Sequence, residues 1–209
     1  MRLNSVPART YTAAFLIALS SALPATAKTS ATVTRSSVSA VDLANIRIDN
    51  FGRVDSNYYR GGQPQRRDYA DLAAIGVKTV INLTSDDAQA NEQAMVEGAG
   101  MTYVSIPMTT HDVPTAAQLA QFLKIVNDSN EQPVYVHCVG GRHRTGVMTA
   151  VYRMAQDGWT ADQAFREMKQ YKFGADFLHS EFKEFVYAYR VDSSRRAASR
   201  AVVATQIGR

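Results

Sequence analysis

One cysteine and an arginine six positions later lie in a glycine-containing stretch that could bind an anion and attack it. The 209-residue chain contains a single cysteine, Cys138, and Arg144 follows it across Gly140 and Gly141. Apolar residues at 134–136 predict a buried strand before this stretch, and the apolar residues after Thr145 predict a helix. A tight loop between a strand and a helix gathers backbone N–H groups at one point, where the helix dipole adds partial positive charge. The stretch therefore predicts an anion-binding loop.

The same loop would activate its cysteine. Backbone N–H groups, the helix N-terminus and Arg144 all favour the thiolate of Cys138, which is the nucleophilic form. The planar fork of Arg144 can hold two phosphate oxygens at once. The nucleotide-binding P-loop is excluded because no lysine follows the glycines. The candidate phosphate-binding residues are Val139, Gly140, Gly141, Arg142, His143 and Arg144.

Cys138, the five residues after it and Arg144, with His137 before and Thr145 behind, resemble the signature of cysteine-based protein tyrosine and dual-specificity phosphatases. The string CVGGRHRTG is most similar to the atypical dual-specificity branch of plants and fungi, whose loop reads C-x-R-G-K-H-R-T-G. Here a glycine and an arginine replace that branch's arginine and lysine. The resemblance spans residues 58–189. It implies an α/β fold and hydrolysis through a phosphocysteine intermediate, without cofactor or metal.

A phosphatase of this kind needs a protonated acid opposite the nucleophile, because the leaving group is a poor one. The family pattern places an aspartate on a loop after an earlier strand. Asp112 fits, because it follows the strand predicted at residues 101–106. Asp112 could instead cap the next helix. Asp86 and Asp87 follow another strand at the same sheet edge and are the alternative acids.

Four further residues have expected roles at the loop. We expect His137 to orient the loop by hydrogen-bonding its backbone, and Thr145 to donate its hydroxyl to the sulfur when the thiolate leaves. Arg142 and His143 should lie at the rim, where their charge would favour a substrate with more than one phosphate group, such as an inositol polyphosphate. Alternatively, Arg142 pairs with a nearby acid and His143 orders the loop. The four histidines show no metal-ligand spacing, so no metal site is expected.

Alternating strand and helix patterns predict an α/β fold with a mostly parallel central sheet flanked by helices. Strands are predicted at residues 46–49, 58–59, 77–83, 101–106 and 134–136, and helices at 68–75, 88–99, 116–126, 145–156, 160–171 and 180–189. Sites in such sheets lie at the carboxyl ends of the strands, where Cys138 is found.

The N-terminus has the pattern of a secretory signal. Arginines at positions 2 and 9 precede a short apolar run at 13–19 and an Ala-Thr-Ala site at 25–27. A membrane-spanning helix needs about 20 apolar residues, so cleavage is favoured over retention as an anchor. The expected organisation is a signal peptide at 1–27, a linker at 28–45, a phosphatase domain at 46–192 and a basic tail at 193–209. We expect a secreted or periplasmic monomer with no stable membrane anchor after cleavage.

The charge distribution gives no reason to expect nucleic acid as a partner. The formal net charge is +4, but the basic excess lies at the two ends of the chain rather than in the domain, where it would have to form a basic face. The expected partner is a phosphorylated protein or an inositol phosphate. Two rivals remain: a rhodanese-like sulfurtransferase, and a non-catalytic phosphate-binding module that needs neither the cysteine nor an acid.

Overall fold

The protein is described by a computed structural model, which places residues 43–85 and 87–191. The predicted signal peptide, most of the predicted linker, the basic tail and Asp86 lie outside the described residues. No helix within the described ranges has the length and apolar composition needed to cross a membrane.

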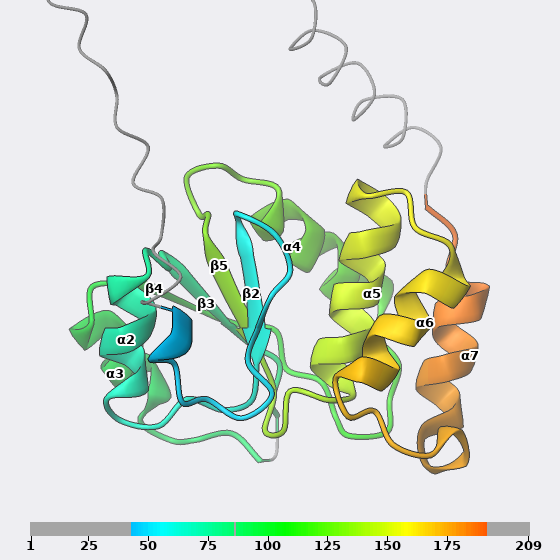
Figure 1. Ribbon diagram of the computed structural model, residues 1–209, viewed down its shortest axis with the longest axis horizontal. Helices are drawn as coiled ribbons and strands as arrows, with labels where there is room; N and C mark the ends of the chain where they lie inside the picture. The colour runs from blue at the N-terminus through cyan, green and yellow to red at the C-terminus, as the bar shows by residue number, and fades with distance from the viewer. Residues whose placement is uncertain (1–42, 86, 192–209) are drawn as a thin grey trace, which may run out of the picture. The chain divides into compact units, whose positions relative to one another are not determined.

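The described chain folds into a five-stranded sheet with helices on both sides, which confirms the predicted fold class (Figure 1). The strand order is β1-β2-β5-β3-β4, and only β1 is antiparallel to its neighbour. The strands are β1 (Gly52–Arg53), β2 (Tyr58–Gly61), β3 (Thr79–Asn82), β4 (Thr102–Ser105) and β5 (Val134–His137). The helices are α2 (Asp68–Ala74), α3 (Glu92–Gly98), α4 (Ala116–Val126), α5 (Arg144–Gln156), α6 (Ala161–Gln170) and α7 (Ser180–Ala188), with a 3₁₀ turn η1 (Asp176–His179) before α7.

Several element boundaries differ from the sequence predictions. The first strand is β1, not residues 46–49, because Ile48 is buried in the core without strand pairing. The helix predicted at 88–99 begins only after Asn91, a residue type that favours helix caps over helix interiors. Helix α5 begins at Arg144, one residue earlier than predicted.

The central strand β5 is buried on both faces because its side chains alternate between two apolar clusters. Val136 packs with Phe122 of α4 and Met148 of α5. Tyr135 points to the opposite face and packs with Leu72 of α2. The sheet is therefore covered by α4 and α5 on one face and by α2 and α3 on the other.

A third apolar cluster joins α6 and α7 to α5. Val147 of α5, Phe165 of α6 and Phe182 of α7 are members of this cluster, and all three are buried. The packing brings the start of α7 close to the start of α5. Residues more than thirty positions apart therefore meet beside the loop that contains the cysteine.

The parallel strands all present their carboxyl ends at one sheet edge. Asn82 at the end of β3 is in register with His137 at the end of β5 and with Ser105 at the end of β4. The segments that follow these strands therefore emerge side by side. Asp87 lies in the segment after β3, residues 107–115 follow β4, and Cys138 follows β5.

Candidate active site

The loop at residues 138–143 is held by donors that bond its carbonyl groups from outside. The N–H of Gln63 donates to the carbonyl of Val139 over 2.9 Å. Nη2 of Arg60 and Nδ2 of Asn50 donate to the carbonyl of Gly141 over 2.7 and 2.8 Å. Because the carbonyl groups are turned toward these donors, the loop's N–H groups are free to face its centre. This is the backbone arrangement that an anion site requires.

Glycine is needed where this loop meets the turn after β2. Gly141 has a φ of +64°, and a Cβ there would lie 2.4 Å from the carbonyl carbon of Gly61. A Cβ on Gly62 would lie 2.9 Å from the carbonyl oxygen of Val139. Two backbone segments thus pack without side chains between them, which fixes the position of the loop.

Arg60 supports the loop from a fully buried position. Its side chain is 0% exposed, and its guanidinium lies 3.9 Å from the ring centroid of Tyr171. Burial lowers the pKa of Arg60. Nε and Nη1 have no hydrogen-bond partner within the described ranges. Its one polar contact to the loop, through Nη2, is therefore costly to lose.

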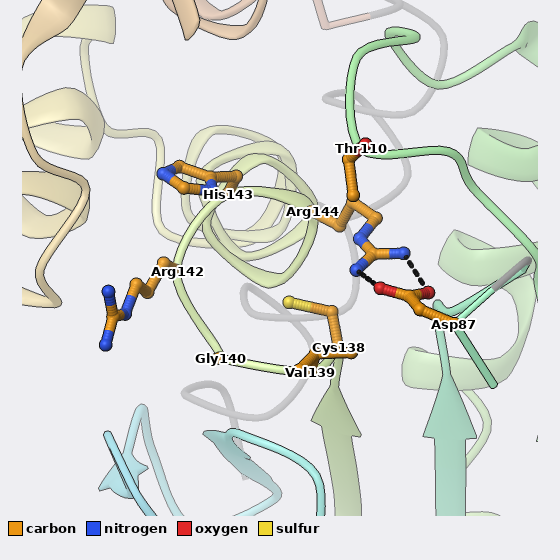
Figure 2. Close-up of a pocket in the computed structure, with 8 residues that line it drawn as sticks. All are labelled: Asp87, Thr110, Cys138, Val139, Gly140, Arg142, His143 and Arg144. Carbon is orange, nitrogen blue, oxygen red and sulfur yellow. Dashed lines mark hydrogen bonds and ion pairs between the residues drawn. The ribbon is translucent and has the colours of Figure 1, made fainter. Parts of the chain in front are cut away.

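A cavity of about 390 Å³ opens over the loop, and most of the predicted site residues line it. Its lining residues are Asp87, Thr110, Cys138, Val139, Gly140, Arg142, His143 and Arg144. Figure 2 shows the sulfur of Cys138 pointing into the loop. The guanidinium of Arg144 lies on the opposite side of the cysteine, against Asp87. Gly141 is buried beneath this lining. The cysteine itself is only 3% exposed, so the cavity is its access to solvent.

Arg144 forms a two-pronged ion pair with Asp87. Nη1 lies 2.9 Å from Oδ1 and Nη2 lies 2.6 Å from Oδ2, and Nη1 also donates to the carbonyl of Met108. Hydrogen bonds from Arg144 hold the pKa of Asp87 below its ordinary value. Burial alone would lower the pKa of Arg144, but Asp87 and Cys138 raise it above its ordinary value. Asp87 thus occupies the fork that was predicted to hold phosphate.

Asp112 lies on the loop at residues 107–115 but is not among the residues that line the cavity. The carboxylate is exposed and accepts a hydrogen bond from Oγ1 of Thr109 over 2.8 Å. The N–H of Asp112 donates back to the same hydroxyl. Two residues earlier, Thr110 lines the cavity. The loop therefore passes the cavity, while the carboxylate of the candidate acid is bonded to Thr109 of the same loop.

The partner of His137 differs from the predicted one. Instead of a hydrogen bond to the loop backbone, Nε2 of His137 lies 2.9 Å from Oε1 of Glu92, and neither side chain is exposed. Glu92 also accepts hydrogen bonds from Gln63 and Asn82. Burial raises the pKa of Glu92, but the contacts with His137, Gln63 and Tyr69 outweigh it and leave the pKa below its ordinary value. His137 is oriented by a buried carboxylate on α3.

The role of Thr145 toward the sulfur of Cys138 stays a prediction. Its side chain is buried in the first turn of α5, and Oγ1 has no hydrogen-bond partner within the described residues. A buried hydroxyl without a partner is costly. This hydroxyl remains available to the sulfur of Cys138.

The two rim residues have partners of their own. Nη2 of Arg142 lies 3.8 Å from Oδ2 of Asp49, and both side chains are about half exposed. Nε2 of His143 contacts the carbonyl of Phe173 over 2.9 Å. Burial lowers the pKa of His143, which disfavours the charged form of the ring. Figure 2 shows both side chains pointing away from Cys138. Their geometry matches the alternative in which Arg142 pairs with an acid and His143 orders the loop.

A family model described as "DSP-PTPase phosphatase fused to NAD+ Kinase" matches residues 36–185, which include the loop and the whole sheet. The chain belongs to this phosphatase family. A dual-specificity protein phosphatase, TpbA of Pseudomonas aeruginosa, is 30% identical over 148 residues, a match that covers 71% of this chain and 66% of TpbA. The inositol diphosphatase SIW14 of Saccharomyces cerevisiae is 24% identical over 157 residues, or 73% of this chain and 55% of SIW14. The chain thus spans just under two thirds of TpbA and about half of SIW14.

Solved structures share the fold. The crystal structure of TpbA superposes with a TM-score of 0.61 at 30% identity, and the match covers 80% of this chain and 99% of the crystallised TpbA chain. The catalytic core of SIW14 superposes with a TM-score of 0.63 at 24% identity and covers 74% of this chain and 93% of that core. At the level of the family, the predictions of a cysteine-based phosphatase and of its fold are confirmed.

Sequence reasoning missed three of the residues that shape this phosphatase site. Asn50, Arg60 and Glu92 are not among the site residues that the sequence predicted. The signal for Arg60 was present in the Arg-Gly-Gly-Gln-Pro string at 60–64. Asn50 has a φ of +57°, but its isolated polar side chain gives no signal in the sequence. Glu92 resembles any acid in the first turn of a helix.

Proposed function

We propose that this protein hydrolyses phosphate monoesters through a phosphocysteine intermediate. One observation carries the proposal: Cys138 and Arg144 face the same cavity, over a loop whose carbonyl groups are bonded from outside. Such a loop stabilises both the thiolate and the developing negative charge on the transferred phosphoryl group. A sulfurtransferase or a binding module would need no acid on a neighbouring loop.

The proposed reaction has two steps. The sulfur of Cys138 attacks phosphorus, and the bond from phosphorus to the ester oxygen breaks. Arg144 and the N–H groups of the loop bind the non-bridging oxygens, and Asp112 gives its proton to the leaving oxygen. Water then attacks phosphorus with Asp112 as base, and Thr145 donates a hydrogen bond to the departing thiolate.

The assignment of Asp112 as the acid is supported by the state of its rival. Asp87 is held ionised by Arg144 and cannot carry a proton while that pair lasts. Asp112 carries no such pair and lies one residue beyond His111 on a loop that already reaches the cavity through Thr110. A rotation of the loop tip that breaks the bond from Thr109 would free the Asp112 carboxylate. Asp86 lies outside the described residues.

The proposed substrate carries more than one phosphate group, as an inositol polyphosphate does, in preference to a phosphotyrosine peptide. We attribute this preference to Arg142, because the ring of His143 is engaged with the carbonyl of Phe173. The pair between Arg142 and Asp49 is long and exposed, so it offers little resistance to a second phosphate. SIW14 is named as an inositol diphosphatase, whereas TpbA has been crystallised with phosphotyrosine.

The substrate proposal predicts that Arg142→Ala lowers the ratio of catalytic efficiencies, inositol polyphosphate over phosphotyrosine peptide. Wild type should show a ratio above one. The matched control is Arg166→Ala, which removes an exposed arginine of α6 that does not line the cavity. If the ratio in wild type lies below one, or if Arg142→Ala leaves it unchanged, the preferred substrate is an ordinary phosphoprotein.

The proposed mechanism is tested with Cys138→Ser. This variant should lose p-nitrophenyl phosphate turnover and keep inorganic phosphate binding, because the hydroxyl of serine stays protonated but the loop and Arg144 remain. Arg144→Met, compared in parallel, should lose phosphate binding as well. Turnover near the wild-type rate in Cys138→Ser would refute the phosphocysteine mechanism. Thiosulfate-to-cyanide transfer by wild type would instead support the sulfurtransferase.

We also propose that the chain is exported and acts as a monomer. The support for export is the pattern of basic, apolar and small residues at 1–27. N-terminal sequencing of the protein recovered from the periplasm or medium should begin at Lys28. Retention of residue 1 in a membrane fraction would show that the segment is an anchor.

A further inference from the structure

Three of the four histidines gather at one side of the active-site cavity. His143 of the phosphate loop lies against His179 at the end of η1, with ring centroids 3.7 Å apart. The ring of His111, from the loop at residues 107–115, stacks on His179 with ring centroids 5.6 Å apart. Glu181 in the first turn of α7 completes the group. None of this was visible in the sequence, where these residues are far apart.

Two of these histidines and the glutamate have the geometry of a metal site. Nδ1 of His179 lies 3.3 Å and Nδ1 of His111 lies 3.8 Å from Oε1 of Glu181. The three ligand atoms all lie within 4.8 Å of one another. A tetrahedral zinc ion with bonds of about 2.0–2.1 Å spaces its ligand atoms about 3.4 Å apart. The group therefore needs only a small contraction to enclose an ion.

The site is also supported and accessible. The ring of His179 is held by contacts with His143, which is in turn bonded to the carbonyl of Phe173. His111 is 74% exposed and Glu181 is 32% exposed, so an ion can enter from solvent. Two imidazoles and one carboxylate with a fourth position open to water form a ligand set that zinc adopts in proteins.

We propose that His111, His179 and Glu181 bind a divalent transition-metal ion of the zinc type. The ion ties the loop at residues 107–115 to the start of α7, two segments that already meet where His111 stacks on His179 and contacts Glu181. This replaces the sequence expectation of no metal site.

The consequence for turnover rests on the proposed role of Asp112. Its neighbour in the chain, His111, becomes a ligand, so the ion fixes the loop tip in the arrangement seen here. In that arrangement Asp112 is outside the cavity lining and bonded to Thr109. Bound zinc should therefore slow the reaction by restraining the acid, and the site would act as a metal-dependent brake.

Metal binding is tested on the full-length chain in the Cys138→Ser background, where no thiolate can capture the ion. Zinc affinity is measured by competition with a chromophoric chelator. We expect the protein to bind one equivalent of zinc. Loss of a group that only supports a metal ligand lowers metal affinity by about 10- to 100-fold. The dissociation constant should therefore rise by at least this factor in His111→Ala and in Glu181→Gln, which each remove a ligand. Mg²⁺ prefers all-oxygen ligands and should not displace the zinc.

The matched control is Glu184→Gln, which changes an exposed carboxylate of the same helix that is outside the ligand group. It should bind zinc as its parent does. Absence of a one-equivalent site in the Cys138→Ser protein would overturn the proposal. Affinity that survives both His111→Ala and Glu181→Gln would overturn it as well.

A kinetic arm separates the brake from direct binding of zinc to the nucleophile. In proteins that retain Cys138, zinc at one equivalent should lower kcat for an alkyl phosphate in wild type and Glu184→Gln, but not in Glu181→Gln. Equal inhibition of all three would place the inhibitory ion on the thiolate and would refute the brake. This outcome would leave the phosphocysteine mechanism intact.

Discussion

At the scale of single residues, the carboxylate that pairs with Arg144 determines the state of the phosphate-binding group. Asp87 offers the arginine two oxygens in the same planar arrangement that a phosphate would offer. The positive charge of Arg144 is therefore balanced, and its guanidinium is held in position, before a substrate binds. Phosphate must share or displace this carboxylate, while the proton donor has to come from a group that is not engaged there.

This division of roles predicts different outcomes for two aspartates. Asp112→Asn should lower turnover by about 10²- to 10⁴-fold, the contribution of a general acid. The loss should be smaller for p-nitrophenyl phosphate than for an alkyl phosphate, because a good leaving group needs little protonation. Steady-state rates with both substrates provide the measurement.

Asp87→Asn is the comparison for that experiment. Removing a negative charge beside an anion site should tighten inorganic phosphate binding, since Arg144 keeps its bond to Met108. The leaving-group dependence should stay as in wild type. Should Asp87→Asn show the acid pattern and Asp112→Asn retain full activity, the acid would be on the loop after β3.

At the scale of elements, helix α3 is tied to the nucleophile strand by a buried contact between a carboxylate and an imidazole. Glu92 begins α3 and His137 ends β5, one residue before the cysteine. Buried pairs of this kind add little net stability compared with an apolar pair, but breaking one is costly because a polar group is left unpaired. The pair therefore fixes the register between helix and strand more than it strengthens the fold.

The Glu92 pair gives a pH-dependent prediction. Glu92→Gln should lower the free energy of unfolding at pH 7 by on the order of 3 kcal/mol. The pKa of Glu92 in the folded state is below its ordinary value, so its carboxylate contributes stability that is fully present above the pKa of the unfolded state. The contribution is lost as the pH falls through the folded-state pKa. Denaturant unfolding at pH 7 and at successively lower pH should show the two proteins converging on the acid side, and a constant difference would contradict this.

At the scale of the whole molecule, the phosphate loop is part of the core rather than an attachment to it. Its backbone contacts the turn after β2, and its ends continue directly into β5 and α5. A ligand that binds only this assembled loop must stabilise the entire fold by mass action. The loop and the domain should unfold together.

The linkage predicts a ligand-dependent stability. Inorganic phosphate at 100 times its dissociation constant should raise the free energy of unfolding by about 2.7 kcal/mol. Denaturant titrations with and without phosphate measure the shift. Gly141→Ala should both destabilise the protein and abolish the shift, because its Cβ would meet the backbone of Gly61. A full phosphate shift in Gly141→Ala would show that the anion binds elsewhere.

The sequence alone determined the local features of this protein. The spacing of Cys138, Gly141 and Arg144 identified the phosphate loop, and the alternation of predicted strands and helices identified a mostly parallel sheet. Apolar residues at helical spacing predicted a helix at residues 116–126, which are the bounds of α4. These features could be predicted because each depends on residues adjacent in the chain or one helical turn apart.

Only the tertiary structure decided which distant groups meet. Asp87 reaches Arg144 because parallel strands end at one edge, and Glu92 reaches His137 because α3 covers one face of the sheet. His111 joins His179 because α7 packs on α5. Such contacts depend on how strands are ordered and helices packed, and a pattern with the period of a single element carries no information about them.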